Sequence, residues 1–310
     1  MSLDLLNLVI IIILNIAFFF VGITLNSLVI LVFWRTTYLR KKLCYFMIFV
    51  LSWCDLLLIL VNHPFVTILA IFFAIDKFQR FPHCVRITLD IVSLTIAPSL
   101  LALLVMNVDR YLSLTYPIYH KANITKRKLL WLLATCILIA SISNILFIDK
   151  LVYSLEVHSI IFLALYVPPM LFTTYKLFKI SRKYRKLRHN KPEKKKIISS
   201  KQISICLLGL ACHMFFNIPV LIFIVYNLLL PVTRASDIFV LWLKTIVAMN
   251  STFNCLIFFW KNTILRSEAM KIIKRTRKYF LYENHNTIPS SIVKNNEHSH
   301  NSYHNSISLS

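Results

Sequence analysis

The sequence predicts an all-α membrane protein, a bundle of seven transmembrane helices followed by a short amphipathic surface helix. Two observations carry this prediction. The 310 residues are 58% hydrophobic and have a mean hydropathy of +0.70, which exceeds the apolar content of ordinary soluble domains. The apolar residues also come in blocks of about 20 or more, the length that crosses a bilayer. None of the blocks alternates like a membrane strand, and helices satisfy every backbone polar group inside the membrane.

Seven apolar segments divide the chain. They cover residues 8–33, 44–72, 84–112, 129–148, 158–180, 201–230 and 238–260. The predicted organisation is a short extracellular N-terminus at 1–7, the bundle at 8–260, an amphipathic helix on the inner leaflet at 261–280 and a disordered cytoplasmic tail at 281–310. The segment 261–280 has apolar residues on one helical face and Lys and Arg on the other. The tail is rich in Asn, Ser and His and poor in apolar residues, which predicts disorder.

The net charge of +23 is unevenly distributed. Four Lys and Arg residues follow the first segment, five lie around the loop between the third and fourth, twelve lie from Lys176 to Lys201, and eight follow the seventh. All four groups fall on one side of the predicted bundle, and positive residues mark the cytoplasmic side. We therefore expect a plasma-membrane protein with its N-terminus outside and its C-terminus inside. The basic surface would face anionic lipids of the bilayer and cytoplasmic proteins, and no nucleic acid.

Polar and proline motifs occur in a fixed order along these segments. They are Gly22 and Asn26, Leu51 to Asp55, Asp109-Arg110-Tyr111, Trp131, Pro168-Pro169 with Tyr175, Pro219, and Asn250-Ser251 with Asn254. The ordered set resembles the rhodopsin-like (class A) G-protein-coupled receptors, in a divergent form, over roughly residues 15–280. The resemblance implies a receptor, not an enzyme, that binds an extracellular small or amphipathic ligand and activates heterotrimeric G proteins by opening of the sixth helix.

The resemblance also implies a set of coupling and switch residues. They are Asp109, Arg110, Tyr111, Tyr175, Pro219 and Asn254. Arg110 is effectively always charged and can pair with Asp109 in an inactive bundle, whereas in the active family members the arginine contacts Gα. Tyr175 lies seven residues after Pro168 instead of the family's eight. Many members carry an acidic residue where this chain has Ser199, which predicts raised basal activity. Arrestin is a further expected partner, through serines of the tail.

Asp55 lies in the middle of a membrane segment, where a carboxylate is costly unless it finds polar partners. In the family, the equivalent Asp coordinates a sodium ion. Asp55 and Ser99 are therefore the candidate metal ligands, within a polar network of Asn26, Asp55, Ser99, Asn250, Ser251 and Asn254. The alternative is a hydrated cluster that only joins the helices. No cofactor other than this sodium ion is expected.

The candidate ligand contacts are Lys244, Asp90, Val92 and Asn217. Val92 stands where amine receptors carry an Asp, and Asp90 is two residues earlier, about 200° around the helix, so ammonium recognition is not expected. Ala248 stands where opsins carry the retinal-linking Lys, so no retinal is expected. Lys244 can pair an anionic ligand group. Its alternative role is to reach the outer headgroups or to pair with Asp90.

Some family positions are altered. Asn217 and His213 replace a Trp and a Phe of the sixth segment, and Cys255 and Phe258 replace the Pro and Tyr of the seventh. Cys84 is the one cysteine near the predicted outer surface, so no extracellular disulfide is expected. Two alternatives to a signalling receptor stay open. One is a receptor-derived binding or heteromer subunit that does not couple. The other is a transporter or channel, which the lack of an inverted repeat disfavours.

Overall fold

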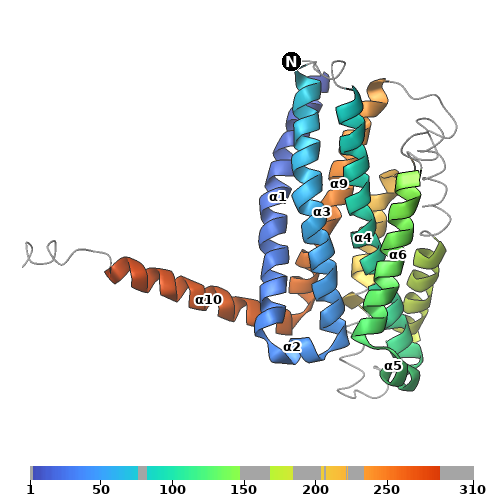
Figure 1. The fold of residues 1–310 in the computed structure, drawn as a ribbon. Coiled ribbons are helices and arrows are strands. Elements are labelled where there is room, and N and C mark those ends of the chain that lie inside the picture. Colours follow the sequence, from blue (N-terminus) through green and yellow to red (C-terminus); the bar gives the residue numbers. More distant parts are fainter. Residues whose placement is uncertain are drawn as a thin grey trace, which may run out of the picture. The chain divides into compact units, whose positions relative to one another are not determined.

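The computed structural model describes residues 3–75, 82–146, 168–183, 204–205, 207–220, 222 and 234–286, and these are almost entirely helical. The helices are α1 (Leu3–Arg35), α2 (Thr37–Lys41), α3 (Leu43–Ala74), α4 (Pro82–Thr115), α5 (Pro117–Asn123), α6 (Lys126–Leu146), α9 (Arg234–Lys261) and α10 (Thr263–Asn286). Residues 168–183 and 207–220 are helical as well. The predicted all-α fold is thereby confirmed for the described part of the chain (Figure 1).

Three helices in the described part are long and apolar enough to cross a membrane, namely α1, α3 and the stretch Ile238–Lys261 of α9. A shorter apolar helix covers Leu207–Val220. In α1, the polar side chains of Asn15 and Asn26 are buried while Ile13 and Phe20 are exposed. This arrangement suits a helix that faces lipid on the outside. The number of seven spans stays a prediction, because parts of the remaining segments lie outside the described residues.

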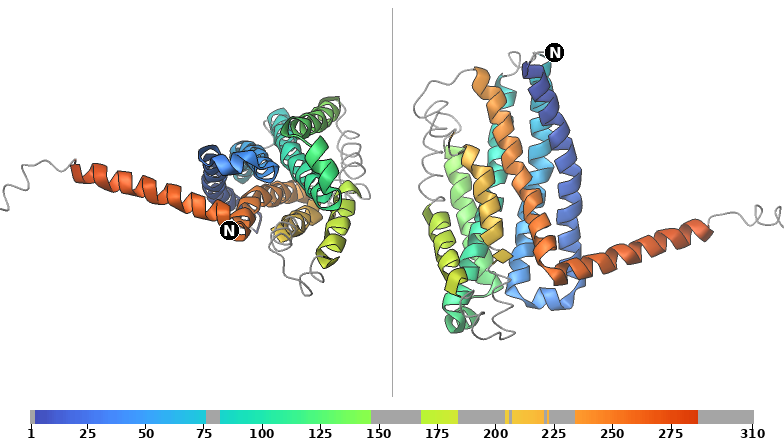
Figure 2. Two further views of the ribbon diagram at one scale, coloured as in Figure 1. Left: turned by 90° about the horizontal axis from the view of Figure 1, so that it is seen from below. Right: turned by 180° about the vertical axis from the view of Figure 1, so that it is seen from behind.

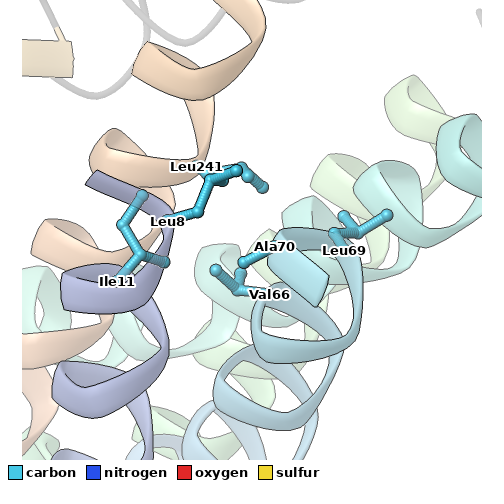
Figure 3. Packing of buried hydrophobic residues seen from close by; sticks show 6 residues of the cluster. All are labelled: Leu8, Ile11, Val66, Leu69, Ala70 and Leu241. Atoms are coloured by element: carbon cyan, nitrogen blue, oxygen red, sulfur yellow. The ribbon is translucent and has the colours of Figure 1, made fainter. Parts of the chain in front are cut away.

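Helix α3 is the centre of the packing. It contacts α1, α4 and α9, while α4 also contacts α6 and α9 (Figures 1 and 2). Near the N-terminal end of α1, apolar side chains from α1, α3 and α9 meet in one cluster (Figure 3). Its buried members are Leu8, Ile11, Val66, Leu69, Ala70 and Leu241. Packing of this kind joins three helices that are distant in sequence, and it needs close fit because lipid gives no hydrophobic drive between helices.

Gly22 permits a close approach of the same three helices. A Cβ atom at this position would lie 2.7 Å from Ile59 Cδ1 of α3 and 2.7 Å from Thr252 Oγ1 of α9. Both separations are shorter than real Cβ contacts, so any larger residue would force a neighbour to move. Gly209 differs, since a Cβ atom there would meet nothing within 4 Å. Of the two glycines in the chain, only Gly22 is required by the packing.

Two short helices close one end of the bundle. α2 connects α1 to α3, and α5 follows α4 with Pro117 at its start (Figure 1), a position at which proline's missing N–H has no cost. Lys126, the first residue of α6, donates from Nζ to the carbonyl oxygen of Arg40 in α2, and the same ammonium lies 5.3 Å from the ring centroid of Phe46. The basic stretches around α2, α5 and the start of α6 therefore share this end.

Helix boundaries differ from the predicted ones at both ends of the chain. α1 begins at Leu3 and so includes most of the stretch expected as a short N-terminus. α10 ends at Asn286, so residues 281–286 are helical and the prediction of a disordered tail from 281 onward is wrong for them. The chain forms two compact units, Met1–Leu265 and Arg266–Ser310. The remainder of the tail lies outside the described residues.

Within the second unit, α10 is amphipathic. Ala269 and Ile272 are buried, whereas the basic residues on the remaining surface are exposed. These are Arg266, Lys271, Lys274, Arg275, Arg277 and Lys278. Two further apolar residues of this helix, Ile264 and Ile273, are exposed.

The described cysteines with a determined environment are all free thiols. They are Cys44, Cys54, Cys136, Cys212 and Cys255. The side chain of Cys84 lies outside the described part, so the expectation of no extracellular disulfide stays a prediction.

Candidate functional site

A buried ion pair ends α4 at the same end of the bundle as α2 and α5. Arg110 donates from Nη2 to Asp109 Oδ2. His120 of α5 places Nε2 2.7 Å from Asp109 Oδ1. The Asp109 side chain is fully buried, and Arg110 is 6% exposed. Both carboxylate oxygens are thus occupied, one by the neighbouring guanidinium and one by a histidine from the next helix. Removing one partner of a buried pair leaves an uncompensated charge, which costs about 3–5 kcal/mol.

Tyr111 extends this site toward helix 168–183. Its ring meets that of Phe172 edge-on, with ring centroids 6.5 Å apart. Tyr175, expected to be part of the switch, is instead 60% exposed. Its place in the switch stays a prediction.

Asp55 is the centre of a second polar site, between α3, α4 and α9. It is fully buried. Ser99 Oγ donates to Asp55 Oδ1, and Asn254 Nδ2 donates to Asp55 Oδ2 over 3.3 Å. The Ser251 hydroxyl lies close to the Asp55 carboxyl group, but it makes no hydrogen bond of ordinary geometry. We call Asp55, Ser99 and Asn254 the Asp55 cluster.

The other two members of the predicted network have different partners. Asn26 donates from Nδ2 to Gly22 O over 3.0 Å and accepts from Cys255 Sγ at 2.9 Å. Cys255 stands where the family has a Pro, so the substitution adds a thiol donor that holds α9 to α1. Asn250 lies with Nδ2 3.2 Å from His213 Nδ1 of helix 207–220. Neither amide shows a hydrogen bond to Asp55 in the described part of the chain.

The Asp55 cluster has the donor chemistry that a sodium ion requires. Hard cations take oxygen ligands, and each nearby residue carries one. Among the described residues, Ser251 Oγ and Asn254 Oδ1 are buried and have no hydrogen-bond partner. Buried oxygens of this kind normally find water or an ion. Within the described part, no group of three or more His, Cys, Asp or Glu residues forms a transition-metal site.

The candidate ligand contacts are placed only in part. Lys244 is half-buried on α9, and its carbonyl oxygen accepts from Asn62 Nδ2 over 3.4 Å. Asn217 is 5% exposed and donates from Nδ2 to His213 O over 2.8 Å. Asp90 and Val92 belong to α4, but their side chains lie outside the described part. Pro219 belongs to helix 207–220, and its role in the switch stays a prediction.

One buried polar cluster was not predicted. Asn15 of α1 donates from Nδ2 to Thr245 Oγ1 of α9 over 2.8 Å, and its Oδ1 lies 2.7 Å from His63 Nδ1 of α3. We call Asn15, His63 and Thr245 the Asn15 cluster. It lies one helical turn from the apolar cluster, since Ile11 precedes Asn15 and Leu241 precedes Thr245 by four residues. The sequence signal that could have identified the Asn15 cluster is the presence of single polar residues within the most apolar segments.

These helices and buried polar sites define a helical membrane protein with an ion pair at one end and a carboxylate in its middle. Residues 25–153 match the family model described as 7 transmembrane receptor (rhodopsin family). Over these residues, the match supports the resemblance to class A G-protein-coupled receptors. The matched residues include Asp55, Ser99, Asp109 and Arg110. No curated protein sequence matches the chain.

Proposed function

We propose that the protein is a receptor that binds an extracellular small or amphipathic ligand and activates heterotrimeric G proteins by outward movement of the helix that contains residues 207–220. The observation that carries this proposal is the buried Asp109–Arg110 pair. An arginine closing a membrane helix is costly unless it is used. Here the guanidinium pairs with the Asp109 carboxylate, which His120 also engages, so a change at this carboxylate would alter how the guanidinium is held.

The distribution of charge supports the proposed orientation. Exposed basic residues gather around α2, α5 and the start of α6, at the end that holds Arg110. By the positive-inside rule this end is cytoplasmic, which puts the N-terminus outside the plasma membrane and the C-terminus inside. Heterotrimeric G protein, and arrestin through the serine-rich tail, are then the cytoplasmic partners. The basic face of α10 suits anionic lipids of the inner leaflet.

We further propose that the Asp55 cluster holds a sodium ion through Asp55, Ser99, Ser251 and Asn254. Two of these residues have buried oxygens without a partner among the described residues. Sodium should raise the thermal stability of the purified receptor, while potassium at the same ionic strength should not. Asp55→Ala should abolish the difference. Equal stability of the wild-type protein in both salts would leave only the hydrated polar cluster.

Lys244 is the proposed ligand contact that is simplest to test. Its position on α9, half-buried, suits pairing with an anionic ligand group, and Asp90, Val92 and Asn217 remain the other proposed contacts. Lys244→Ala should abolish the response to an active ligand while surface expression is retained. An unchanged response would leave the lysine the role of anchoring α9 at the outer headgroups.

A second candidate function is a binding or heteromer subunit that does not couple. The altered positions favour it, because Cys255 and His213 make contacts that the family's Pro and Phe cannot make. Phe258 is also buried without the hydroxyl of the family's Tyr. This reading predicts normal ligand binding with no nucleotide exchange on any Gα subunit.

The deciding experiment measures ligand-free activation of a panel of Gα subunits at matched surface expression. Wild type is compared with Arg110→Ala and with Arg127→Ala, an exposed arginine at the same end. A receptor gives a basal signal that Arg110→Ala abolishes and Arg127→Ala retains. Because Ser199 replaces an acidic restraint, this signal should exceed that of empty cells. A silent wild type that still binds ligand supports the subunit, and ion flux in reconstituted vesicles would indicate a transporter or channel.

A further inference from the structure

Helix 207–220 meets α9 through two contacts of different kinds. One is polar, between His213 Nδ1 and Asn250 Nδ2, which are 3.2 Å apart. The other is aromatic, between Phe216 and Phe253, whose ring centroids are 5.0 Å apart. Figure 2 shows this helix, in gold, beside α9 in orange. The aromatic contact is of the kind that many helix pairs use, whereas the polar one lies at a position where the family has a Phe.

The polar contact is fully enclosed. His213 is 0% exposed, Asn250 is 2% exposed and Asn217 is 5% exposed. Asn217 donates to His213 O over 2.8 Å, and its amide nitrogen also lies 3.3 Å from His213 Nδ1. We call His213, Asn217 and Asn250 the His213 cluster. With Nδ1 as the acceptor for Asn250, the imidazole is held from α9 by Asn250, while Asn217 bonds to the backbone of its own helix at His213 O.

The His213 cluster is also next to the Asp55 cluster. Asn250 and Asn254 are four residues apart, so they lie on one face of α9. The first amide meets helix 207–220 and the second meets Asp55 of α3. One face of α9 therefore holds two neighbouring helices by amide contacts one turn apart. Moving helix 207–220 away from α9 would break the buried hydrogen bond between Asn250 and His213, which opposes that movement.

We propose that His213 is a positioning residue whose contact with Asn250 holds helix 207–220 against α9 and thereby limits its outward movement. The inference rests on the proposed function, because it concerns the helix whose opening activates the G protein. In this chain the contact between the two helices includes a directional hydrogen bond, so opening requires that this bond be broken.

The test uses the full-length receptor in lipid nanodiscs. Two fluorophores on non-canonical amino acids at Ser204 and Lys121, both exposed, report the separation of helix 207–220 from α5 by energy transfer. His213→Phe restores the family's residue and is expected to fold, and Asn250→Ala removes the partner. His213→Gln keeps an acceptor. Asn62→Ala is the matched control, since it removes a buried amide that bonds to α9 at Lys244 but not to helix 207–220.

His213→Phe and Asn250→Ala should each increase the population with the longer separation by roughly 2- to 10-fold, the range of one net hydrogen bond. The double variant should add nothing further, because both changes remove the same contact. His213→Gln should retain most of the wild-type distribution, and Asn62→Ala should not change it. Basal nucleotide exchange on Gα should rise in the same order.

Energy transfer that stays unchanged in both single variants would overturn the proposal, as would effects that add in the double variant. A change of the same size in Asn62→Ala would also overturn the proposal, because loss of any buried amide would then increase the separation of the helices. Failure of the proposed function is a separate result. If no variant shows an Arg110-dependent signal but the separation changes as expected, the His213 contact is supported and the receptor does not couple.

Discussion

Replacing each of the two glycines by alanine should affect stability differently, with Gly22→Ala the less stable variant. A Cβ atom at Gly22 would come within 2.7 Å of Ile59 Cδ1 and of Thr252 Oγ1, whereas a Cβ atom at Gly209 would meet nothing within 4 Å. Both glycines lie inside helices, so both substitutions gain the same intrinsic helix propensity. Comparing the two variants therefore separates the cost of the close Cβ contacts at Gly22 from the gain in helix propensity, which both variants share.

The expected magnitudes follow from these contacts. Glycine to alanine inside a helix gains about 1 kcal/mol, and forcing an extra carbon into a packed site costs about 1–3 kcal/mol. Gly209→Ala should therefore be neutral or stabilising. Gly22→Ala should be less stable than Gly209→Ala by about 1–3 kcal/mol. Ile59 can move its terminal carbon aside, but Thr252 is β-branched and stiff, so the threonine contact should contribute most of the cost.

The assay is reversible unfolding of the purified receptor in bicelles, titrated with dodecyl sulfate. Thr252→Ala removes the obstructing oxygen, so the loss caused by Gly22→Ala should shrink in that background. A Gly22→Ala variant as stable as Gly209→Ala would refute the reasoning. An undiminished loss in the Thr252→Ala background would show that the threonine is not the obstacle.

Three further substitutions test single buried contacts. Cys255→Ala should lower unfolding stability by about 1–3 kcal/mol because it leaves Asn26 Oδ1 without a donor, and Cys255→Ser should lower it less; equal losses would refute the thiol's role as donor. Asn15→Ala should cost a similar amount, about 1–3 kcal/mol, since its partners on α3 and α9 lose their bonds, and a neutral result would contradict this. His120→Ala should cost about 0.5–1.5 kcal/mol by thermal unfolding, whereas His120→Gln keeps an amide donor toward Asp109 and should lose less.

Those parts of the site that depend on one helix, or on a motif that keeps the family's residues, were predictable from sequence. The Asp109–Arg110 pair joins adjacent residues, so it needs no tertiary information. The contact of Asp55 with Ser99 and Asn254 followed from the resemblance, because those three positions keep the family's residue types. In both cases local spacing or an unaltered motif was sufficient.

The contacts that depend on an altered position were not predictable from sequence. Asn26 accepts from Cys255, and Asn250 meets His213, partners that the family's Pro and Phe do not offer. In both cases the residue itself was identified, but its partner lies on another helix, and no local pattern connects the two.

The Asn15 cluster also bears on how the chain is made. The partners of Asn15 lie 48 and 230 residues later in the sequence. At a synthesis rate of about 5–20 residues per second, Thr245 emerges roughly 10 to 50 s after Asn15. During that interval Asn15 has the carbonyl oxygen of Ile11, 2.8 Å away in its own helix, as an acceptor. Helix α1 can therefore enter the bilayer with the Asn15 amide already bonded to Ile11 O. The bond from Asn15 to Thr245 forms later, when α9 has been inserted.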